Sequence, residues 1–280
     1  MLTVLAGAVL LAPERNLSRL HEGYPPGGPQ DAFAAAAANR LVGNRPEAPV
    51  LEVSLGLCRI LVGGPVTLAV TGAPGQLRVN GAPAPTDRAL VLEGRSELRF
   101  SFHPHLGFRA YLALAGGIEP APGRTDTYAP GGLPSRRPWP RMPHDAFFWA
   151  PRLGDVRFVA GPEATPAALE VLTGSPWQVD PQSSGMGLRL RGPRLALPAF
   201  DILSAPVQDG TLQATRQGLA VLLRERGTLG GYPRVGTVID CDVDRLAQFR
   251  AGQRIHFEEV DLETAQAACE RQRGVMEAGL

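Results

Sequence analysis

The most informative stretch of the chain is Thr228-Leu229-Gly230-Gly231-Tyr232-Pro233-Arg234-Val235-Gly236-Thr237-Val238-Ile239-Asp240. Two adjacent glycines before Tyr-Pro predict a backbone turn with unusual dihedral angles, which lets another chain or a ligand approach closely. Residues 235–239 then predict a strand, 242–249 a helix with Leu246 and Phe249 on one side, and 254–257 a second strand. We therefore expect a turn, strand, helix, turn and strand in succession.

Short strands are predicted for most of the remaining chain. A helix is predicted over 32–41, where alanines follow Asp31, whose carboxylate can cap the helix N-terminus. A second helix is predicted over 165–172, and Val79-Asn80-Gly81 is typical of a hairpin. The predicted strands cover 2–11, 50–54, 58–62, 67–71, 76–79, 89–92, 97–102, 109–115, 156–159, 177–179, 188–190 and 219–223. Short strands separated by Gly, Pro, Asn and Asp indicate a barrel or sandwich.

The chain is long enough for two domains: it has 280 residues, with 33 glycines and 27 prolines. Proline and glycine crowd residues 118–154, which we interpret as a linker or long loop. We expect an N-terminal β domain over 1–117 and a C-terminal β domain over 155–262. Residues 263–280 are predicted to be a mildly helical tail.

The charge balance excludes some classes of partner. The formal net charge is +1, which gives no reason to expect nucleic acid or an anionic membrane. Residues 1–12 are apolar, but they lack a basic leader region and are too few to span a bilayer, so we expect a soluble, cytoplasmic protein. Cys58, Cys241 and Cys269 are widely spaced, which fits a reducing compartment and argues against a disulfide framework or a zinc site.

The chain contains no lysine, so all 28 residues counted as Lys or Arg are arginines. This excludes a P-loop lysine, a Schiff-base lysine and a lysine that carries biotin. If the protein works with ATP or biotin, another polypeptide has to supply the ATP site or the attached biotin.

The residues alone indicate no independent catalytic centre. His103-Pro104-His105 could place two imidazoles on one side of a strand, but no carboxylate or cysteine is near in sequence, so we expect a surface loop and no metal site. Ser183-Ser184 has no base beside it in sequence, and neither a G-x-S-x-G nor an H-E-x-x-H motif occurs.

Four ordered blocks of sequence resemble one family. Residues 31–52 are similar to a segment in which a Ser-Gly-Ala-Met-Asp turn enters a helix ending in ANRLVGN, and residues 109–118 to a strand and turn written RAYLAVAGGI. Residues 180–190 are similar to a block written SPQSDRMGYRL, and residues 228–257 to the family's C-terminal TTGGYPKIGTVI unit. The chain thus resembles the biotin-dependent carboxyltransferase (allophanate hydrolase subunit 2, Kip antikinase-antagonist) family, which includes the C subunit of 5-oxoprolinase.

The resemblance implies a mainly β protein with two related cyclophilin-like β-barrel domains and a few short helices. It implies two partner proteins, namely the A subunit of 5-oxoprolinase and the similarly folded B subunit. Together the three proteins open 5-oxoproline to glutamate at the expense of ATP. Two other functions remain open: a non-catalytic binding or regulatory relative of the Kip type, and the carboxyltransferase part of a biotin-dependent urea or allophanate pathway, with biotin supplied by a partner.

The resemblance also implies the candidate site residues. Those with possible catalytic roles are Asp31, Ser183, Thr228, Gly230 and Gly231; those with possible substrate-binding roles are Asn39, Arg40, Gln182, Met186, Arg189, Tyr232 and Pro233. Arg40 or Arg189 could grip a carboxylate with two hydrogen bonds, and the Gly230-Gly231 backbone could donate N–H groups to an oxyanion. Each residue also has a purely structural interpretation, as a cap, a brace or a turn.

Several polar family positions are altered in this chain. Gly27-Gly28-Pro29-Gln30-Asp31 replaces Ser-Gly-Ala-Met-Asp, Ser183-Ser184-Gly185-Met186 replaces Ser-Asp-Arg-Met, and residues 225–229 replace Asp-Arg-Gln-Thr-Thr. Residues 123–127 likewise shift or lose the arginine of a Gly-Ser-Arg-Ser-Thr turn. These changes predict either altered substrate choice or a family member that has lost catalysis.

Overall fold

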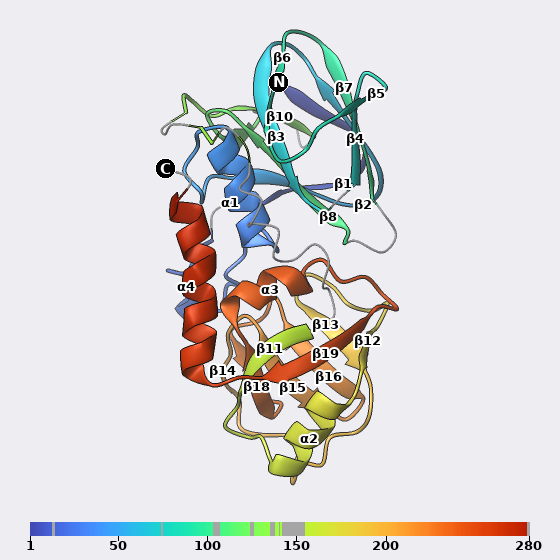
Figure 1. The fold of residues 1–280 in the computed structure, drawn as a ribbon, viewed down its shortest axis with the longest axis vertical. Coiled ribbons are helices and arrows are strands. Elements are labelled where there is room, and N and C mark those ends of the chain that lie inside the picture. The colour runs from blue at the N-terminus through green and yellow to red at the C-terminus, as the bar shows by residue number, and fades with distance from the viewer. Residues whose placement is uncertain are drawn as a thin grey trace. The chain divides into compact units, whose positions relative to one another are not determined.

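The computed structural model describes residues 1–12, 15–73, 75–102, 107–123, 126–134, 138–139, 141 and 155–278. The chain divides into two compact units (Figure 1). The N-terminal unit comprises residues 1–15, 31–150 and 274–280, and the C-terminal unit comprises residues 16–30 and 151–273. The prediction of a mainly β protein with a few helices is confirmed, and the C-terminal unit contains a closed barrel.

The N-terminal unit is built on a ten-stranded sheet with a branch in it. One path runs in the order β5-β4-β7-β2-β1-β10-β9, while β8 joins β2 to β3 and β3 pairs with β6. The strands are β1 (Leu2–Ala12), β2 (Val50–Val62), β3 (Val66–Gly72), β4 (Gly75–Val79), β5 (Ala82–Ala84), β6 (Ala89–Leu92), β7 (Ser96–Phe102), β8 (Arg109–Leu114), β9 (Ile118–Pro120) and β10 (Thr127–Pro130).

The long strand β2 explains the branch. The sequence predicts two strands here, over 50–54 and 58–62, but the structure has one strand that changes partner along its length. Its first part pairs with β8 from Leu51 to Ser54, and its last part pairs with β7 from Cys58 to Val62. Strand β1 runs along the other edge of β2, with register shifts between Val4 and Ala8.

Helix α1 (Ala32–Leu41) matches the predicted range and lies against the sheet (Figure 1). Asp31 is its N-cap, since the carboxylate accepts a hydrogen bond from the backbone N–H of Ala34 at 2.9 Å. The buried alanines of the helix pack with Ala69 of β3 and with Tyr111 and Ala113 of β8. Small side chains let the helix approach the strands closely, which explains the alanine run.

The predicted linker begins with two strands that the sequence did not indicate. Strands β9 and β10 lie within the range 118–154 and extend the sheet beside β1, where Leu2 pairs with Tyr128. They are three and four residues long, too short for a periodic pattern. The predicted hairpin is confirmed: Asn80 and Gly81 both have positive φ and join β4 to β5.

The C-terminal unit is a closed seven-stranded barrel in the order β11-β18-β15-β16-β13-β12-β19. Its strands are β11 (Asp155–Ala160), β12 (Trp177–Val179), β13 (Gly187–Arg191), β15 (Thr211–Thr215), β16 (Gly218–Leu222), β18 (Arg234–Val238) and β19 (Arg254–Glu259). The pair β11–β19 is parallel and the other pairs are antiparallel. Two short strands, β14 (Ala205–Pro206) and β17 (Leu229–Gly230), pair outside the barrel.

Within the described ranges, three α-helices and one short 3₁₀ helix accompany the barrel. They are α2 (Pro166–Gly174), α3 (Asp240–Leu246), α4 (Leu262–Ala278) and η1 (Leu20–Glu22). Leu172 of α2 and Leu246 of α3 are buried in the barrel core, as is Phe249 just beyond α3. The helix predicted over 242–249 therefore has the right buried side, but it begins at Asp240 and ends at Leu246. The predicted tail is the helix α4, whose last residues, from Gly274 onward, group with the N-terminal unit.

Residues 16–30 belong to the C-terminal unit, although the sequence led us to place them in a domain spanning 1–117. The backbone N–H of Gly27 donates to the carbonyl of Arg224 at 3.0 Å. Contacts between segments so far apart along the chain leave no local pattern, so the sequence could not reveal them.

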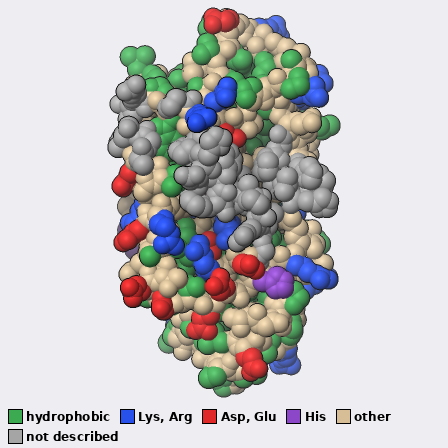
Figure 2. All heavy atoms as spheres, in the orientation of Figure 1, with side chains coloured by type: hydrophobic (Ala, Val, Ile, Leu, Met, Phe, Trp, Pro, Cys, Tyr) green, Lys and Arg blue, Asp and Glu red, His purple; other side chains and the backbone are tan. Residues whose placement is uncertain are grey.

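On the face drawn in Figure 2, acidic and basic side chains are interspersed over the described residues, as expected for a net charge of +1. No helix in the described ranges is long and apolar enough to cross a membrane.

Candidate functional site

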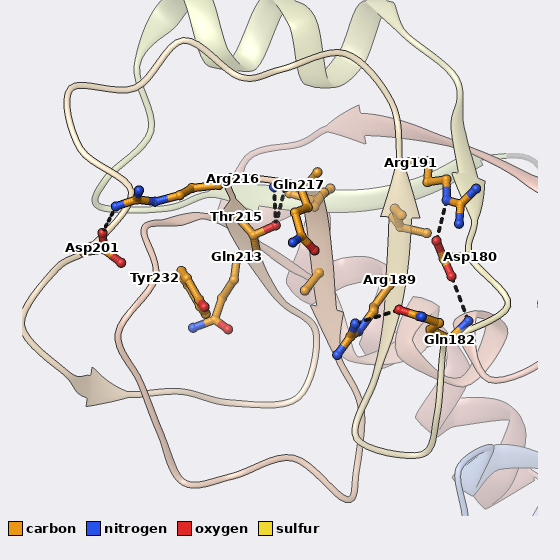
Figure 3. A pocket seen from close by; sticks show the side chains of 14 residues that line it. Asp180, Gln182, Arg189, Arg191, Asp201, Gln213, Thr215, Arg216, Gln217 and Tyr232 are labelled. Carbon is orange, nitrogen blue, oxygen red and sulfur yellow. Dashed lines mark hydrogen bonds and ion pairs between the residues drawn. The ribbon is translucent and has the colours of Figure 1, made fainter.

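The C-terminal unit has a pocket of about 560 Å³ on the outside of strands β13, β15 and β16 (Figure 3). It contains three residues that the sequence pointed to: Gln182, Arg189 and Tyr232. Its other charged and polar lining residues are Asp180, Arg191, Asp201, Gln213, Thr215, Arg216 and Gln217. Residues from two separate sequence blocks, 180–190 and 228–233, therefore meet at one cavity.

The charges lining the pocket favour an anion. Three arginines face two aspartates. Arg191 is paired with Asp180, and Arg216 lies 2.5 Å from Asp201 between Nη2 and Oδ2. Arg189, in contrast, donates from Nη1 to the side-chain oxygen of Gln182 at 3.0 Å, and among the described residues it pairs with no carboxylate. One guanidinium is thus left to receive an anionic group, which it can hold with two hydrogen bonds.

A tight turn holds Gln182 and Arg189 in place. The Asp180 carboxylate accepts from the backbone N–H of Gln182 at 2.7 Å, and this bond, together with Arg191, holds the pKa of Asp180 below its ordinary value. The Ser183 hydroxyl donates to the Asp180 carbonyl at 2.7 Å and accepts from the Arg189 backbone N–H at 3.0 Å. A third contact, to the Arg189 carbonyl at 3.4 Å, is also with the backbone, so Ser183 acts as a brace of this turn.

Gln213 is a pocket residue that the sequence analysis missed. It lies in the middle of β15, is only 5% exposed, and its Nε2 has no hydrogen-bond partner within the described part of the chain. The available signal was the pattern Leu212-Gln213-Ala214, in which a polar residue stands between two apolar ones. The sequence analysis predicts no strand over these residues.

Of the Gly230-Gly231 pair, only Gly230 is required by close packing. Neither glycine has a positive φ, so the prediction of unusual dihedral angles is wrong. The predicted close approach is real at Gly230, because a β-carbon there would lie 2.3 Å from Nε2 of Gln213. At Gly231 the nearest atoms to such a β-carbon, the Ile202 carbonyl oxygen and the Ser204 hydroxyl, are 3.4 Å away.

The residues beside the glycines have different surroundings. Tyr232 is 43% exposed at the pocket, while Pro233 is buried and its carbonyl accepts from the backbone N–H of Ala214 at 2.9 Å. The carbonyl of Thr228 accepts from the backbone N–H of Val207 at 3.1 Å. Of these three, only Tyr232 lines the pocket.

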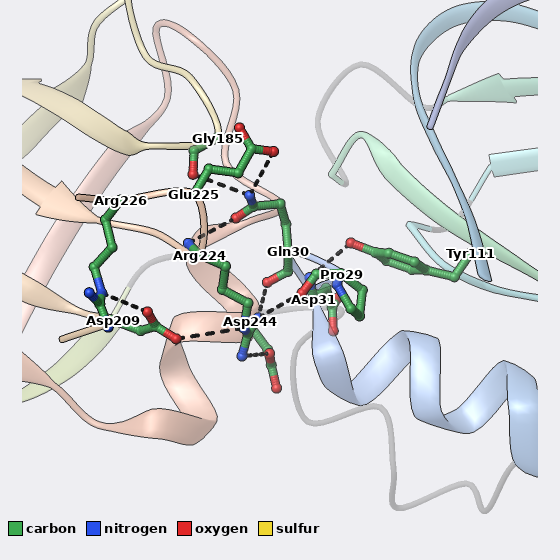
Figure 4. Close-up of polar contacts among 10 residues, drawn as sticks. All are labelled: Pro29, Gln30, Asp31, Tyr111, Gly185, Asp209, Arg224, Glu225, Arg226 and Asp244. Atoms are coloured by element: carbon green, nitrogen blue, oxygen red, sulfur yellow. Dashed lines mark hydrogen bonds and ion pairs between the residues drawn. The ribbon is translucent and has the colours of Figure 1, made fainter. Parts of the chain in front are cut away.

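Three of the altered segments meet at Gln30 (Figure 4). Its side-chain amide donates to the Gly185 carbonyl at 3.2 Å and to the Glu225 carboxylate at 3.4 Å. A β-carbon on Gly185 would lie 2.4 Å from the Glu225 carboxyl group, so a glycine is needed here for Glu225 to come so close. Exposed Met186 follows directly and bonds through its backbone to Leu223. The altered positions 30, 185 and 225 therefore form one hydrogen-bonded set.

A buried ion network ties residues 27–30 to the barrel. Nη1 of Arg224 donates to the carbonyls of Pro29, at 3.3 Å, and of Gln30, while Nη2 lies 2.9 Å from Oδ1 of Asp244. Asp209 lies between Arg224 and Arg226 and accepts from Nε of Arg226 at 2.8 Å. Charges this deeply buried need such pairing, so the network fixes the segment on the barrel.

Three further predicted residues lie in the N-terminal unit and have structural partners. Asp31 caps α1, and its backbone N–H donates to the Tyr111 hydroxyl at 2.8 Å. Asn39 donates to the carbonyls of Pro46 and Ala48 and accepts from the Asn44 side chain. Arg40 is buried with its guanidinium 5.2 Å from the Trp139 ring centroid. None of the three lines the pocket of the C-terminal unit.

Two sequence features lie outside the described residues. These are His103-Pro104-His105 and the pair Arg124-Thr125 of the altered 123–127 turn.

Comparisons with known proteins match nearly the whole length of the chain to related proteins. A family model described as carboxyltransferase domain, subdomain A and B, matches residues 22–128 and 129–259. The C subunit of 5-oxoprolinase from Escherichia coli (strain K12) is 33% identical over 275 residues, which cover 89% of this chain and 87% of that protein.

Solved structures share the fold. The crystal structure of TTHA0988 superposes with a TM-score of 0.79 at 29% identity, over 92% of this chain and 55% of that one. The K. lactis urea amidolyase superposes with a TM-score of 0.86 at 20% identity, over 100% of this chain but only 20% of that much longer one. The predicted family resemblance is confirmed.

Proposed function

Because the chain belongs to the family of the carboxyltransferase domain, subdomain A and B, we propose that it is the C subunit of a 5-oxoprolinase-type complex. In that complex it works with the A and B subunits in the cytoplasm, and the ring of 5-oxoproline is opened to glutamate at the expense of ATP. The substrate is small, carries a carboxylate, and contains one ring amide.

The observation that carries this proposal is the position of Arg189 in the pocket. The pocket volume of about 560 Å³ suits a small molecule, and three arginines against two aspartates leave a net positive lining. Arg189 is the arginine without a carboxylate partner among the described residues, and a planar guanidinium matches a carboxylate in shape and charge. We assign Arg189 to the substrate carboxylate, with Gln182 orienting the guanidinium and Tyr232 forming the rim.

ATP is assigned to one of the partner proteins. The chain has no lysine and hence no P-loop lysine. In the pocket, Arg191 and Arg216 are already paired with Asp180 and Asp201, and those carboxylates would repel a triphosphate. The lining thus fits a single carboxylate better than a nucleotide. No nucleic acid or membrane partner is proposed.

A second candidate function is the carboxyltransferase part of a biotin-dependent urea pathway. The likeness to urea amidolyase from Lachancea kluyveri, 23% identical over 91% of this chain, favours it. Biotin would have to arrive on a partner, because this chain has no lysine to carry it. A third candidate, a regulatory relative of the Kip type, is favoured by Gly185, which stands where the family pattern has an arginine.

Reconstitution tests the proposal. The A and B subunits from the same organism are mixed with 5-oxoproline and ATP, with and without this chain, and both ADP and glutamate are measured. We expect release of both products to depend on the chain. Turnover that is independent of it, in a mixture where it demonstrably binds the B subunit, would contradict a catalytic role and favour the regulatory one. Turnover only with a carboxybiotin donor and urea would favour the carboxyltransferase.

A further inference from the structure

The side-chain amide of Gln213 is a buried hydrogen-bond donor at the pocket that lacks an acceptor. Gln213 is 5% exposed, it lines the pocket, and Nε2 has no hydrogen-bond partner among the described residues. A buried donor left without an acceptor is costly, so such groups are rare unless a ligand or water satisfies them. Figure 3 shows the side chain extending from β15 toward Tyr232 at the pocket.

The surrounding backbone keeps this donor in place. Leu212 and Ala214, its neighbours in β15, are fully buried in the barrel core, so the strand cannot easily rotate. Pairing of Gln213 with Ala220 on one side and Arg234 on the other fixes its register. Gly230 supplies the space, since any β-carbon there would displace the amide. The amide therefore has a defined position, with Nε2 beside Gly230.

We infer that Gln213 is a specificity-determining residue whose Nε2 donates a hydrogen bond to a carbonyl oxygen of the ligand in this pocket. The class of ligand is a small molecule with a carbonyl oxygen. That it also carries a carboxylate held by Arg189 rests on the proposed function. For 5-oxoproline the two groups are distinct: Arg189 takes the carboxylate, and Gln213 takes the ring carbonyl. Gln213 thus selects for the amide that the reaction opens.

Two ring acids that differ only in a ring carbonyl measure the effect of this hydrogen bond by itself. 3-Oxocyclopentanecarboxylate has a ring carbonyl in the same relation to the carboxylate as 5-oxoproline, and cyclopentanecarboxylate lacks it. Their affinities for the full chain are measured by calorimetry, together with those of 5-oxoproline and urea. We expect the wild type to prefer the keto acid about tenfold, the effect of one good hydrogen bond that satisfies a buried donor.

The variants separate the two contacts. Gln213→Met keeps the length of the side chain but removes the donor. Its affinities for the keto acid and for cyclopentanecarboxylate should therefore be about equal. Arg189→Met should weaken the binding of both ring acids by a similar factor and leave the preference for the keto acid unchanged. Gly227→Ala is the matched control for Gly230→Ala, because a β-carbon at Gly227 has its nearest contact at 3.6 Å. Only Gly230→Ala should lower the preference.

The outcomes distinguish this inference from the proposed function. A keto-acid preference that survives in Gln213→Met overturns the role of Gln213 and leaves the proposed function standing. Binding of urea that is lost in Gln213→Met, without binding of any ring acid, supports Gln213 and overturns the 5-oxoproline proposal. Binding of none of the four compounds to the wild type overturns both.

Discussion

The α-carbon of Gly230 lies against the side-chain amide of Gln213, so that a β-carbon at position 230 would stand 2.3 Å from Nε2 of Gln213 and 3.1 Å from Cγ1 of Val207. This contact explains why position 230 is a glycine, and the explanation does not depend on a special backbone conformation. It also connects the Gly-Gly-Tyr-Pro segment with the wall of the pocket.

Gly230→Ala is predicted to move the Gln213 amide without unfolding the barrel. The atom that meets the new methyl group is the end of a flexible side chain, which can give way at a cost of about 1 kcal/mol. In the reconstituted complex we expect KM for 5-oxoproline to rise roughly tenfold, the value of one lost hydrogen bond. Gly227→Ala serves as control, and equal KM values for the two variants would count against this contact.

Gln213→Met is predicted to stabilise the ligand-free chain. The variant removes a buried donor without a partner in the described structure, and we expect the free energy of unfolding to rise by about 1 kcal/mol. Urea unfolding measures it. Gln178→Met is the control, because exposed Gln178 donates to the Gly252 carbonyl at 3.2 Å and should gain nothing. A loss of stability in Gln213→Met would mean that the amide has a structural partner.

The ion pair between Arg234 and Glu163 predicts a dependence of stability on pH. Arg234 follows Pro233, and its side chain bonds both oxygens of Glu163, at 2.7 and 2.9 Å, while its backbone N–H bonds one of them. These bonds lower the pKa of Glu163 below its ordinary value of 4.5. The contribution of this ion pair to the free energy of unfolding is therefore complete above pH 4.5. It is lost as the pH falls through the lower pKa that Glu163 has in the folded state.

Glu163→Gln makes this measurable. At about pH 7 the variant should have the smaller free energy of unfolding, and the difference from the wild type should shrink as the pH is lowered below about 4.5. Urea unfolding at a series of pH values gives the difference. A constant difference over the whole range would show that the carboxylate charge is not what stabilises this corner of the barrel.

Arg224→Met is predicted to release residues 16–30 from the barrel. The substitution removes the bonds to Pro29 and Gln30 and leaves Asp244 buried without this arginine, at a cost of about 3–5 kcal/mol. Trypsin should then cut faster after Arg15 or Arg19. Arg254→Met, a change at an exposed arginine of β19, is the control. Unchanged cleavage in Arg224→Met would contradict the anchoring role of this network.

Local patterns predicted much of the fold. The alanine run with its Asp31 cap gave the bounds of α1, and Asn80-Gly81 gave the β4–β5 hairpin, because caps and tight turns depend on neighbouring residues. Strand β15 was missed because only Leu212 and Ala214 of its five residues are apolar, too few to stand out as a strand, although its threonines favour one. The partner change of β2 likewise depends on distant strands.

The residues of the site could be predicted only where they lie in the family-like sequence blocks. Residues Gln182, Arg189 and Tyr232 came from the family-like blocks and lie at one pocket. Asp31, Asn39 and Arg40 came from another block, and their observed contacts are those of a cap and braces. Gln213 could not be found in this way, because its significance lies in a missing hydrogen-bond partner and in Gly230, seventeen residues further along.

The most direct test of the central claim is the dependence of reconstituted turnover on 5-oxoproline concentration, with Arg189→Met and Arg254→Met compared with the wild type. Loss of a charged hydrogen bond to the substrate costs about 1.5–3 kcal/mol, so we predict that Arg189→Met raises KM by at least about tenfold. Arg254→Met should reproduce the wild-type curve. Identical curves for all three proteins would contradict the assignment of this pocket to the substrate.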